Sequence, residues 1–388
     1  MSYSIQTSSL QLNSHLLEAD EWIRIYRLSG KHQDGSKLLL GAAEWDHSTG
    51  QVLRFTLEYS LSRQRPAGLF AKQFEKRNEL LSHLAFNGSP SILPSVVKQH
   101  ALDDLFQNAS LGFLLSHSYV MGAPIYSLPV LLVSETHDLS VRKIDLSHGI
   151  TLKCNSRTIE IPAENRNLTP DTPLLPDFSY YDAAYAGDTI PGNGRVVIQL
   201  AGNSIARVHH TGHQQNPPYR AAGLVLSIRS EALPPMWDMK DKELEIIIPG
   251  LENAVFGVQS SYYWERGKGE VETDARLSTY LARDPEPAQT RYLLGLTTQK
   301  KWVVLTLPHS DSPWRGLSLH ELPELLEEMN FQWAIGLDAA NGSSLYRGVQ
   351  RIRLSEKDPD EFFNPFATDT NQSGAVSNAF ILYRDKLF

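Results

Sequence analysis

The segment around Asp338 carries the side chains best suited to chemistry in this sequence. Asp338 ends an alternating apolar run, and small or polar residues follow it, Ala339-Ala340-Asn341-Gly342-Ser343-Ser344. Small side chains let a ligand approach the backbone closely, and consecutive N–H groups with serine hydroxyls can form a concave anion-binding surface. The pattern indicates a phosphate or sugar site with an acid at its edge, although an ordinary reverse turn at Asn341-Gly342 has the same signature.

Two periodic elements lead into this loop and must position it. Ser318 to Met329 is predicted to be a helix, because Ser318 and Glu321 form a capping-box pattern and the apolar residues recur at helical spacing. Pro323 fits poorly beyond the first turn, so a start a few residues later is also compatible with the sequence. Phe331 to Asp338 alternates large apolar residues with smaller ones and is predicted to be a strand.

Short alternating segments separated by turn residues dominate the rest of the chain. Strand periodicity is found in residues 22–61 and 124–161, and residues 194–209 have the pattern of a hairpin. One further helix is predicted at Leu69–Leu84, running into the turn sequence Asn87-Gly88-Ser89-Pro90. Because strands come in runs rather than alternating with helices, we expect a β-rich α+β fold with mixed sheets and a few packed helices.

Composition restricts the classes of function. The 388 residues include 36 Lys and Arg against 44 Asp and Glu, a net charge of -8, and show no basic stripe, so a nucleic-acid partner is not expected. The longest apolar runs, Pro129–Val133 and Ile246–Pro249, are far shorter than the roughly 20 residues that cross a bilayer. Residues 1–18 lack a targeting pattern. We therefore expect a cytoplasmic protein without a membrane partner.

Metal and cofactor sites are not expected. The single cysteine, Cys154, cannot form an intramolecular disulfide, and no Cys/His spacing is typical of zinc. His209, His210 and His213 are close in sequence, but adjacent residues of a strand point to opposite faces, which favours exposed side chains over a metal site. Tyr262-Tyr263-Trp264 could stack on a sugar, yet a strand with one buried face is the more common use of such a run.

Several segments, in this order along the chain, resemble the phosphodiester glycosidase family, which includes the catalytic domain of the lysosomal mannose-6-phosphate uncovering enzyme. The family's strand ending in Asp-Gly-Gly-Gly-Ser-Ser is similar to Leu337–Ser344, with alanines here in place of the first glycines. Tyr292 likewise replaces a small Thr. The other similar segments are Asn87-Gly88-Ser89, Asn165-Arg166, Tyr180–Gly187, Ala222–Ser227, Arg291–Leu296, Gly316–Leu319 with Glu321-Leu322, and Gly374–Ala379.

The resemblance covers roughly Val52 to Tyr383. It implies N-terminal strands in residues 1–51 and a phosphodiester glycosidase-like domain in residues 52–388, which we expect to form one compact unit together. The activity it implies is hydrolysis of a sugar, or a sugar-like group, from a phosphodiester, with a small-molecule substrate and no cofactor.

The resemblance also assigns roles to individual residues. Arg291 would clamp the phosphate, because a guanidinium makes two parallel hydrogen bonds to phosphate oxygens. Asp338 would act as a base or stabilise positive charge at the anomeric carbon. Asn87, beside Gly88, would bind a hydroxyl or orient water. The remaining expected contacts to phosphate or sugar come from Asn341, Gly342, Ser343 and Ser344.

Two other functions remain open at this point. The alanines after Asp338 are compatible with a catalytically degenerate module that binds a sugar phosphate or a nucleotide. A structural or assembly protein with a filled pocket is the third alternative, and Tyr292 or the Ala339-Ala340 segment could supply the filling.

Overall fold

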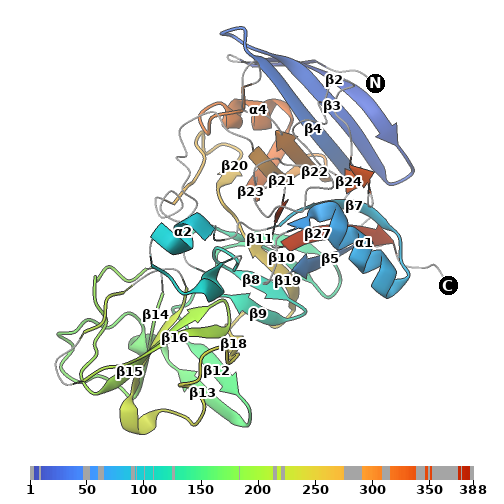
Figure 1. Cartoon of the computed structure of the whole chain (residues 1–388). Helices are drawn as coiled ribbons and strands as arrows, with labels where there is room; N and C mark the ends of the chain where they lie inside the picture. The colour runs from blue at the N-terminus through green and yellow to red at the C-terminus, as the bar shows by residue number, and fades with distance from the viewer. Residues whose placement is uncertain are drawn as a thin grey trace. The chain divides into compact units, whose positions relative to one another are not determined.

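The computed structural model shows a chain that forms two compact units (Figure 1). Unit 1 comprises Met1–Pro90, Thr136–Asp138 and Ser260–Phe388, and unit 2 comprises Ser91–Glu135 and Leu139–Gln259. The predicted boundary between residues 51 and 52 stays a prediction. The structure describes residues 4–7, 10–46, 53–59, 65–88, 92, 94–99, 101–107, 109–124, 127–182, 184–212, 216–219, 223–274, 291–307, 315–337, 346–347, 350–351, 375–376 and 378–384.

Unit 1 contains an eight-stranded antiparallel sheet. In spatial order its strands are β1 (Ser4–Gln6), β2 (Leu10–Ala19), β3 (Ile23–His32), β4 (Lys37–Asp46), β22 (Lys301–Leu307), β21 (Arg291–Thr297), β23 (Phe331–Gly336) and β20 (Tyr263–Glu265). Helix α4 (Leu322–Glu328) buries Leu322, Leu325 and Leu326 in the same apolar cluster as Leu293 and Phe331 of the sheet. Strands from the two ends of the chain therefore share one core.

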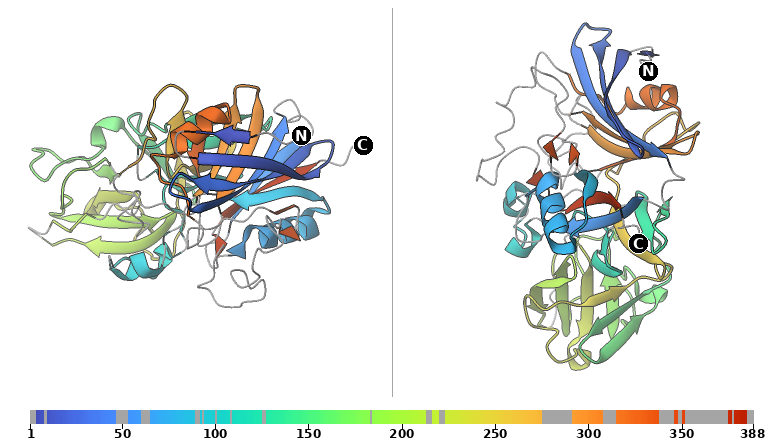
Figure 2. Two further views of the ribbon diagram at one scale, coloured as in Figure 1. Left: turned by 90° about the horizontal axis from the view of Figure 1, so that it is seen from above. Right: turned by 90° about the vertical axis from the view of Figure 1, so that its right-hand side faces the viewer.

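A second antiparallel sheet of unit 1 has the strand order β25 (Gln350–Arg351), β24 (Tyr346–Arg347), β7 (Ser82–Asn87), β27 (Asn378–Arg384) and β5 (Leu53–Tyr59). Helix α1 (Ala67–Asn78) covers one face through Phe70 and Phe74 (Figure 2). A short ribbon pairs β6 (Arg65–Pro66) with β26 (Ala375–Val376). Trp45 of β4 contacts the rings of Phe55 and Phe86, which joins the two sheets of this unit.

Unit 2 is built from three antiparallel sheets. The first sheet has the strand order β11 (Leu139–Arg142), β10 (Val130–Ser134), β19 (Ala254–Gln259), β8 (Leu114–Ser116) and β9 (Tyr119–Gly122). The second has the order β13 (Arg157–Ile161), β12 (Ile150–Cys154) and β18 (Glu245–Ile247). The third has the order β14 (Phe178–Tyr181), β17 (Val225–Arg229), β15 (Arg195–Ala201) and β16 (Ser204–His210). Short helices are α2 (Pro94–Gln99), η2 (Asp104–Phe106), η3 (Ala163–Asn165) and η4 (Ser230–Ala232).

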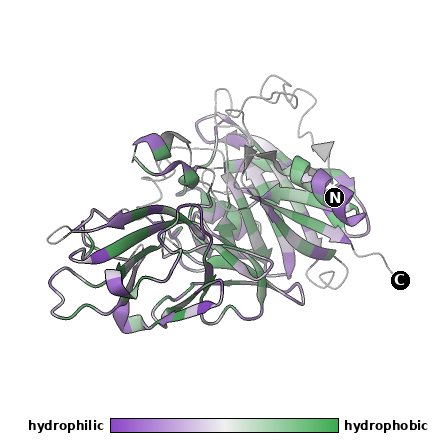
Figure 3. Cartoon of the chain, turned by 60° about the horizontal axis from the view of Figure 1, so that its bottom comes forward, coloured by the Kyte–Doolittle hydropathy of each residue, from purple (hydrophilic) through white to green (hydrophobic). Residues whose placement is uncertain are grey.

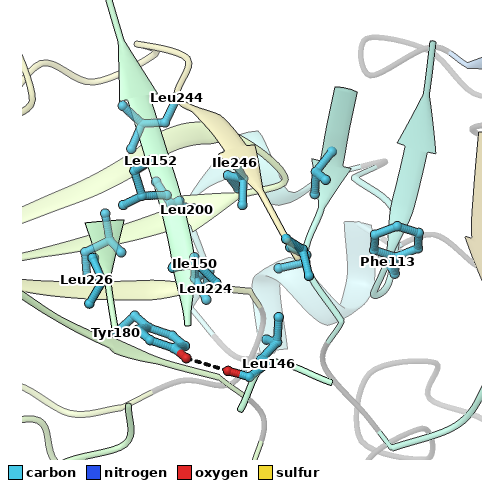
Figure 4. Packing of buried hydrophobic residues seen from close by; sticks show 14 of the residues in the cluster. Phe113, Leu146, Ile150, Leu152, Tyr180, Leu200, Leu224, Leu226, Leu244 and Ile246 are labelled. Carbon is cyan, nitrogen blue, oxygen red and sulfur yellow. Dashed lines mark hydrogen bonds between the residues drawn. The ribbon is translucent and has the colours of Figure 1, made fainter. Parts of the chain in front are cut away.

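The core of unit 2 forms where these sheets turn their apolar faces inward. Hydrophobic residues, green in Figure 3, alternate with hydrophilic ones along many of the strands. The buried cluster in Figure 4 includes Ile150, Leu152, Leu226 and Ile246, and the hydroxyl of Tyr180 donates to the carbonyl oxygen of Leu146 at 2.6 Å within it. The buried hydroxyl of Tyr180 thus has its hydrogen-bond partner within the core.

The β-rich α+β class predicted from the sequence is confirmed, whereas the expected mixed sheets are antiparallel in the described part of the chain, because neighbouring strands run in opposite directions. The predicted hairpin of residues 194–209 is β15 and β16, with Gly202 at a φ of +65° in the turn. The capping-box bonds are present, because Ser318 N donates to Oε2 of Glu321 at 2.9 Å and Glu321 N donates to Oγ of Ser318 at 3.3 Å. Helix α4 itself begins at Leu322, so the later start is correct.

The predicted helix Leu69–Leu84 is wrong in its second half. Helix α1 ends at Asn78, whose side-chain amide donates to the carbonyl oxygen of Phe74 at 3.0 Å. Glu79 follows with a left-handed φ of 55°, which ends the helix, and Leu84 then lies in β7. None of the helices in the described ranges combines the length and hydropathy needed to span a bilayer.

Candidate functional site

The start of β21 and the end of β23 lie side by side in unit 1. These antiparallel strands pair Leu293 with Gly336, and the backbone N–H of Leu337 donates to the carbonyl oxygen of Tyr292 at 2.8 Å. Arg291 is the first residue of β21, and Asp338 follows Leu337 directly in the sequence. The two sequence segments expected to supply catalytic groups therefore approach each other at one end of these neighbouring strands.

Most of the expected ligand contacts lie outside the described residues. These are Asp338, Asn341, Gly342, Ser343 and Ser344, so their roles stay predictions. Arg291 is placed by its strand pairing with Leu307 of β22. The structure thus gives the position of the backbone at Arg291 and at Leu337, the residue before Asp338.

A tight packing contact holds the end of β23. A Cβ atom at Gly336 would lie 2.3 Å from the ring of Tyr262 and 2.5 Å from Oγ of Ser261, so only glycine leaves room there. Backbone bonds of 2.8 Å from Ser261 N to Gly336 O and 2.7 Å from Gly336 N to Tyr262 O complete the contact. The contacts with Ser261 and Tyr262 therefore hold the backbone in place at Gly336, two residues before Asp338.

Buried aromatic residues pack in the core of unit 1 near the start of β21 and the end of β23. Tyr292, which stands where the resembled family has a small Thr, is fully buried, and the hydroxyl of Tyr262 donates to its carbonyl oxygen at 3.3 Å. Trp264 of β20 is fully buried as well, and Tyr262 is 5% exposed. For these two residues the structure agrees with a strand that buries one face rather than with a platform for stacking a sugar.

Asn87 and Gly88 lie on the second sheet of unit 1. Asn87 ends β7, pairs with Ala379 of β27 and is only 1% exposed. Gly88 N donates to the carbonyl oxygen of Asn378 at 3.1 Å, and a Cβ atom at Gly88 would lie 1.9 Å from Oδ1 of Asn378. The close neighbour is thus the buried Asn378, which the sequence did not single out because pairing of β7 with β27 is a long-range contact.

A polar network in unit 2 joins two other segments of the resemblance. Arg166 Nε donates to Oδ2 of Asp182 at 2.8 Å, and the side-chain amide of Asn167 donates to Oδ1 of Asp182 at 2.9 Å. Asp182 N returns a bond to Oδ1 of Asn167 at 3.0 Å. Asp182 is 3% exposed, so these bonds compensate the burial of its carboxylate. The sequence indicated this network only through the two similar segments Asn165-Arg166 and Tyr180–Gly187, which contain Arg166 and Asp182.

Arg195 is a buried cation that the sequence analysis missed. Its Nε donates to Oγ of Ser227 at 2.7 Å, and its two terminal nitrogens donate to the carbonyl oxygens of Pro176 at 2.8 Å and Ser227 at 2.7 Å. Burial lowers the pKa of Arg195, although a guanidinium still remains charged at neutral pH. Arg195 is the first residue of β15, and nothing in the neighbouring sequence distinguishes this arginine from an exposed one.

No group of three or more His, Cys, Asp or Glu side chains that could hold a metal ion occurs in the described ranges. His209 and His210 are exposed at the end of β16, as their positions on a strand predicted, and His213 lies outside the described residues.

Comparisons with known proteins show a likeness of fold. No protein-family model and no curated protein sequence matches the chain. A hypothetical protein from Synechocystis superposes with a TM-score of 0.53 at 14% identity, covering 96% of this chain, which spans 64% of the length of that protein. A solved structure from Burkholderia pseudomallei K96243 gives a TM-score of 0.48 at 14% identity, covering 92% and 77% of the two chains.

The catalytic domain of zebrafish N-acetylglucosamine-1-phosphodiester alpha-N-acetylglucosaminidase, auto-inhibited by its pro-peptide, gives a TM-score of 0.45 at 9% identity, with 98% and 89% of the two chains covered. Of the three similarities, that to the Synechocystis protein is the highest in TM-score. The chain thus shares the β-rich fold of that protein.

Proposed function

We propose that the chain is a hydrolase that removes a sugar, or a sugar-like group, from a phosphodiester. The observation that supports this most directly is the hydrogen bond from Leu337 N to Tyr292 O, because it brings the strand that begins at Arg291 beside the strand that leads to Asp338. The order of motifs along the sequence is the second support. The substrate would be a small molecule, and no cofactor is needed for the reaction.

The proposed reaction breaks the bond between the anomeric carbon and the bridging oxygen. The electron pair of that bond goes to the departing phosphate, the oxygen of water bonds to the anomeric carbon, and the water proton passes to Asp338. Arg291 would hold the phosphate by two parallel hydrogen bonds. The backbone and serines of residues 341–344 would stabilise the charge that grows on the phosphate oxygens. The products are a free sugar and a phosphomonoester.

The test is turnover of sugar phosphodiesters in water labelled with oxygen-18. UDP-glucose and the methyl diester of glucose 1-phosphate represent nucleotide-sugar and simple substrates. We expect the label in the sugar, because water attacks carbon rather than phosphorus. Asp338→Asn and Arg291→Lys should each lower turnover by a factor of about 100 or more.

The matched control is Asp171→Asn, which changes an exposed carboxylate in unit 2 and should leave turnover at the wild-type level. Label in the phosphate would contradict attack at carbon. Turnover that survives Asp338→Asn would remove Asp338 from the mechanism.

A second candidate is a degenerate module that binds a sugar phosphate or a nucleotide without hydrolysis. The alanines at positions 339 and 340 support it, because they replace glycines of the resembled family. The full burial of Tyr292 and the 1% exposure of Asn87 instead fit the third alternative, a structural protein with a filled pocket. Calorimetric titration with UDP-glucose distinguishes the candidates, since the degenerate module requires binding with no product. The cytoplasmic location expected from the sequence is part of the proposal, and cell fractionation would test it.

A further inference from the structure

An open pocket of about 440 Å³ lies in unit 2, on the loop between η3 and β14. Its lining combines Glu164 and Asn165 of η3, Thr172 and Leu174 of the loop, and Asp177 and Arg229 at the strand ends. Its volume falls within the roughly 300–1,000 Å³ of small-molecule sites. The described lining residues all belong to unit 2, so the pocket lies within that unit.

Two arginines hold the wall of this pocket in place. Arg229 contacts Oδ1 of Asp177 at 3.2 Å through Nε and donates to the carbonyl oxygen of Leu175 at 3.2 Å. From behind, the buried Arg195 donates to the carbonyl oxygen of Pro176 at 2.8 Å. Backbone N–H of Arg229 also donates to the carbonyl oxygen of Asp177 at 2.8 Å. The wall is therefore organised before any ligand arrives, which reduces the entropy cost of binding.

The charge of the lining disfavours an anionic ligand. Arg229 is the one cationic side chain among the described residues that line the pocket, and Asp177 already pairs with it. Glu164 adds a second carboxylate, so the lining carries a net negative charge that repels phosphate and carboxylate groups. Among the described residues no aromatic side chain lines the pocket, so these residues do not form the cage that recognises quaternary ammonium groups.

The hydrogen-bonding groups of the lining are left open. Within the described part of the chain, the side chains of Glu164, Asn165 and Thr172 form no hydrogen bond to another residue. Together they offer carboxylate acceptors, an amide that donates and accepts, and a hydroxyl that does both. Leu174, 82% exposed, supplies apolar surface beside them. A matching ligand has several hydroxyl groups and a C–H face.

We propose that this pocket binds a neutral polyhydroxylated ring of monosaccharide size. Hydroxyls of the ring donate to Glu164 and both donate to and accept from Asn165 and Thr172, while its C–H face covers Leu174. The proposal does not depend on the hydrolase activity, because it assigns ligand contacts only to residues of unit 2.

The experiment uses the full chain with D-glucose, D-galactose and myo-inositol as probes. Saturation-transfer NMR detects binding, and the labelled methyl groups of Leu168 and Leu174 report the place and the Kd. We expect both methyl signals to shift. Thr172→Val, which removes a hydroxyl at nearly constant shape, and Asn165→Ala should each raise the Kd about fivefold or more. The matched controls Thr158→Val and Glu160→Gln alter exposed residues of β13 and should keep the wild-type Kd.

Three results would overturn the proposal. These are the absence of saturation transfer to all three probes, a Kd unchanged in both pocket variants, or stronger shifts of the Leu174 methyl with inorganic phosphate or tetramethylammonium than with the polyols. Asp338→Asn separates this site from the hydrolase proposal, because it should abolish turnover and leave the shifts of Leu174 intact.

Discussion

Arg195 donates to the hydroxyl of Ser227 at 2.7 Å across the adjacent strands β15 and β17, with only 3% of the arginine exposed. Carbonyl oxygens of Pro176, Asp177 and Ser227 accept its remaining bonds, and none of the described carboxylates forms an ion pair with it. Because only neutral acceptors compensate the burial of this charge, the loss of any one of these hydrogen bonds should destabilise the fold. The arginine therefore ties the loop before β14 to the sheet.

Replacing this arginine should destabilise unit 2. Arg195→Met leaves buried carbonyl oxygens and the hydroxyl of Ser227 without a donor, so we expect the free energy of unfolding to fall by about 3 kcal/mol or more. Urea denaturation followed by far-UV circular dichroism measures the change. Arg157→Met, on an exposed position of β13, is the control and should stay within about 0.5 kcal/mol of wild type. Equal stability of the two variants would contradict the bonding role.

Tyr180 should make stability fall at alkaline pH. Burial raises the pKa of its phenol to about 12, with the carboxylates of Asp182 and Asp145 adding to the effect and Arg166 opposing it. The fold thus favours the neutral phenol, whose contribution is complete below pH 10, the pKa of an unfolded tyrosine, and is lost as pH rises through the folded pKa.

The corresponding variant is Tyr180→Phe, which also removes the shorter of two hydrogen bonds to the carbonyl oxygen of Leu146 and leaves the one from Gly149 N at 3.3 Å. We expect a loss of about 1 kcal/mol at pH 7, the net value of one hydrogen bond, and a weaker decline in stability above pH 10 than in wild type. Urea unfolding at several pH values measures both. Tyr119→Phe, at a residue 58% exposed, should leave stability and its pH dependence nearly unchanged. If the free energy of unfolding of Tyr180→Phe declined above pH 10 as steeply as that of wild type, Tyr180 would not be the cause of the decline.

Gly88 should not tolerate a side chain. Gly88→Ala would place a Cβ atom 1.9 Å from Oδ1 of the fully buried Asn378, so the enclosed side chain of Asn378 must move. We expect a loss of about 1–3 kcal/mol in the free energy of unfolding. Gly212→Ala is the matched control, because its Cβ atom meets nothing within 4 Å. If thermal unfolding gave the same midpoint for both variants, the close approach to Asn378 would be refuted.

Local patterns in the sequence predicted the local features of the fold. Alternation identified β23, the capping box placed Ser318 and Glu321 in contact, and the turn residues between β15 and β16 identified a hairpin. The error at Leu69–Leu84 has a local cause as well, because helical spacing of apolar residues continued past the left-handed turn at Glu79 into a strand. The predicted roles of Asp338 and residues 341–344 remain untested.

The sequence by itself determined which segments form strands, where turns occur and which side chains are suited to phosphate or sugar chemistry, since these depend on neighbouring residues. Only the tertiary structure decided that β4 pairs with β22, that Leu337 meets Tyr292, and that Asn87 and Arg195 are buried. Such facts depend on contacts between residues far apart in the chain. An arginine on a strand has the same local pattern whether water or the carbonyl oxygen of Pro176 accepts its hydrogen bond.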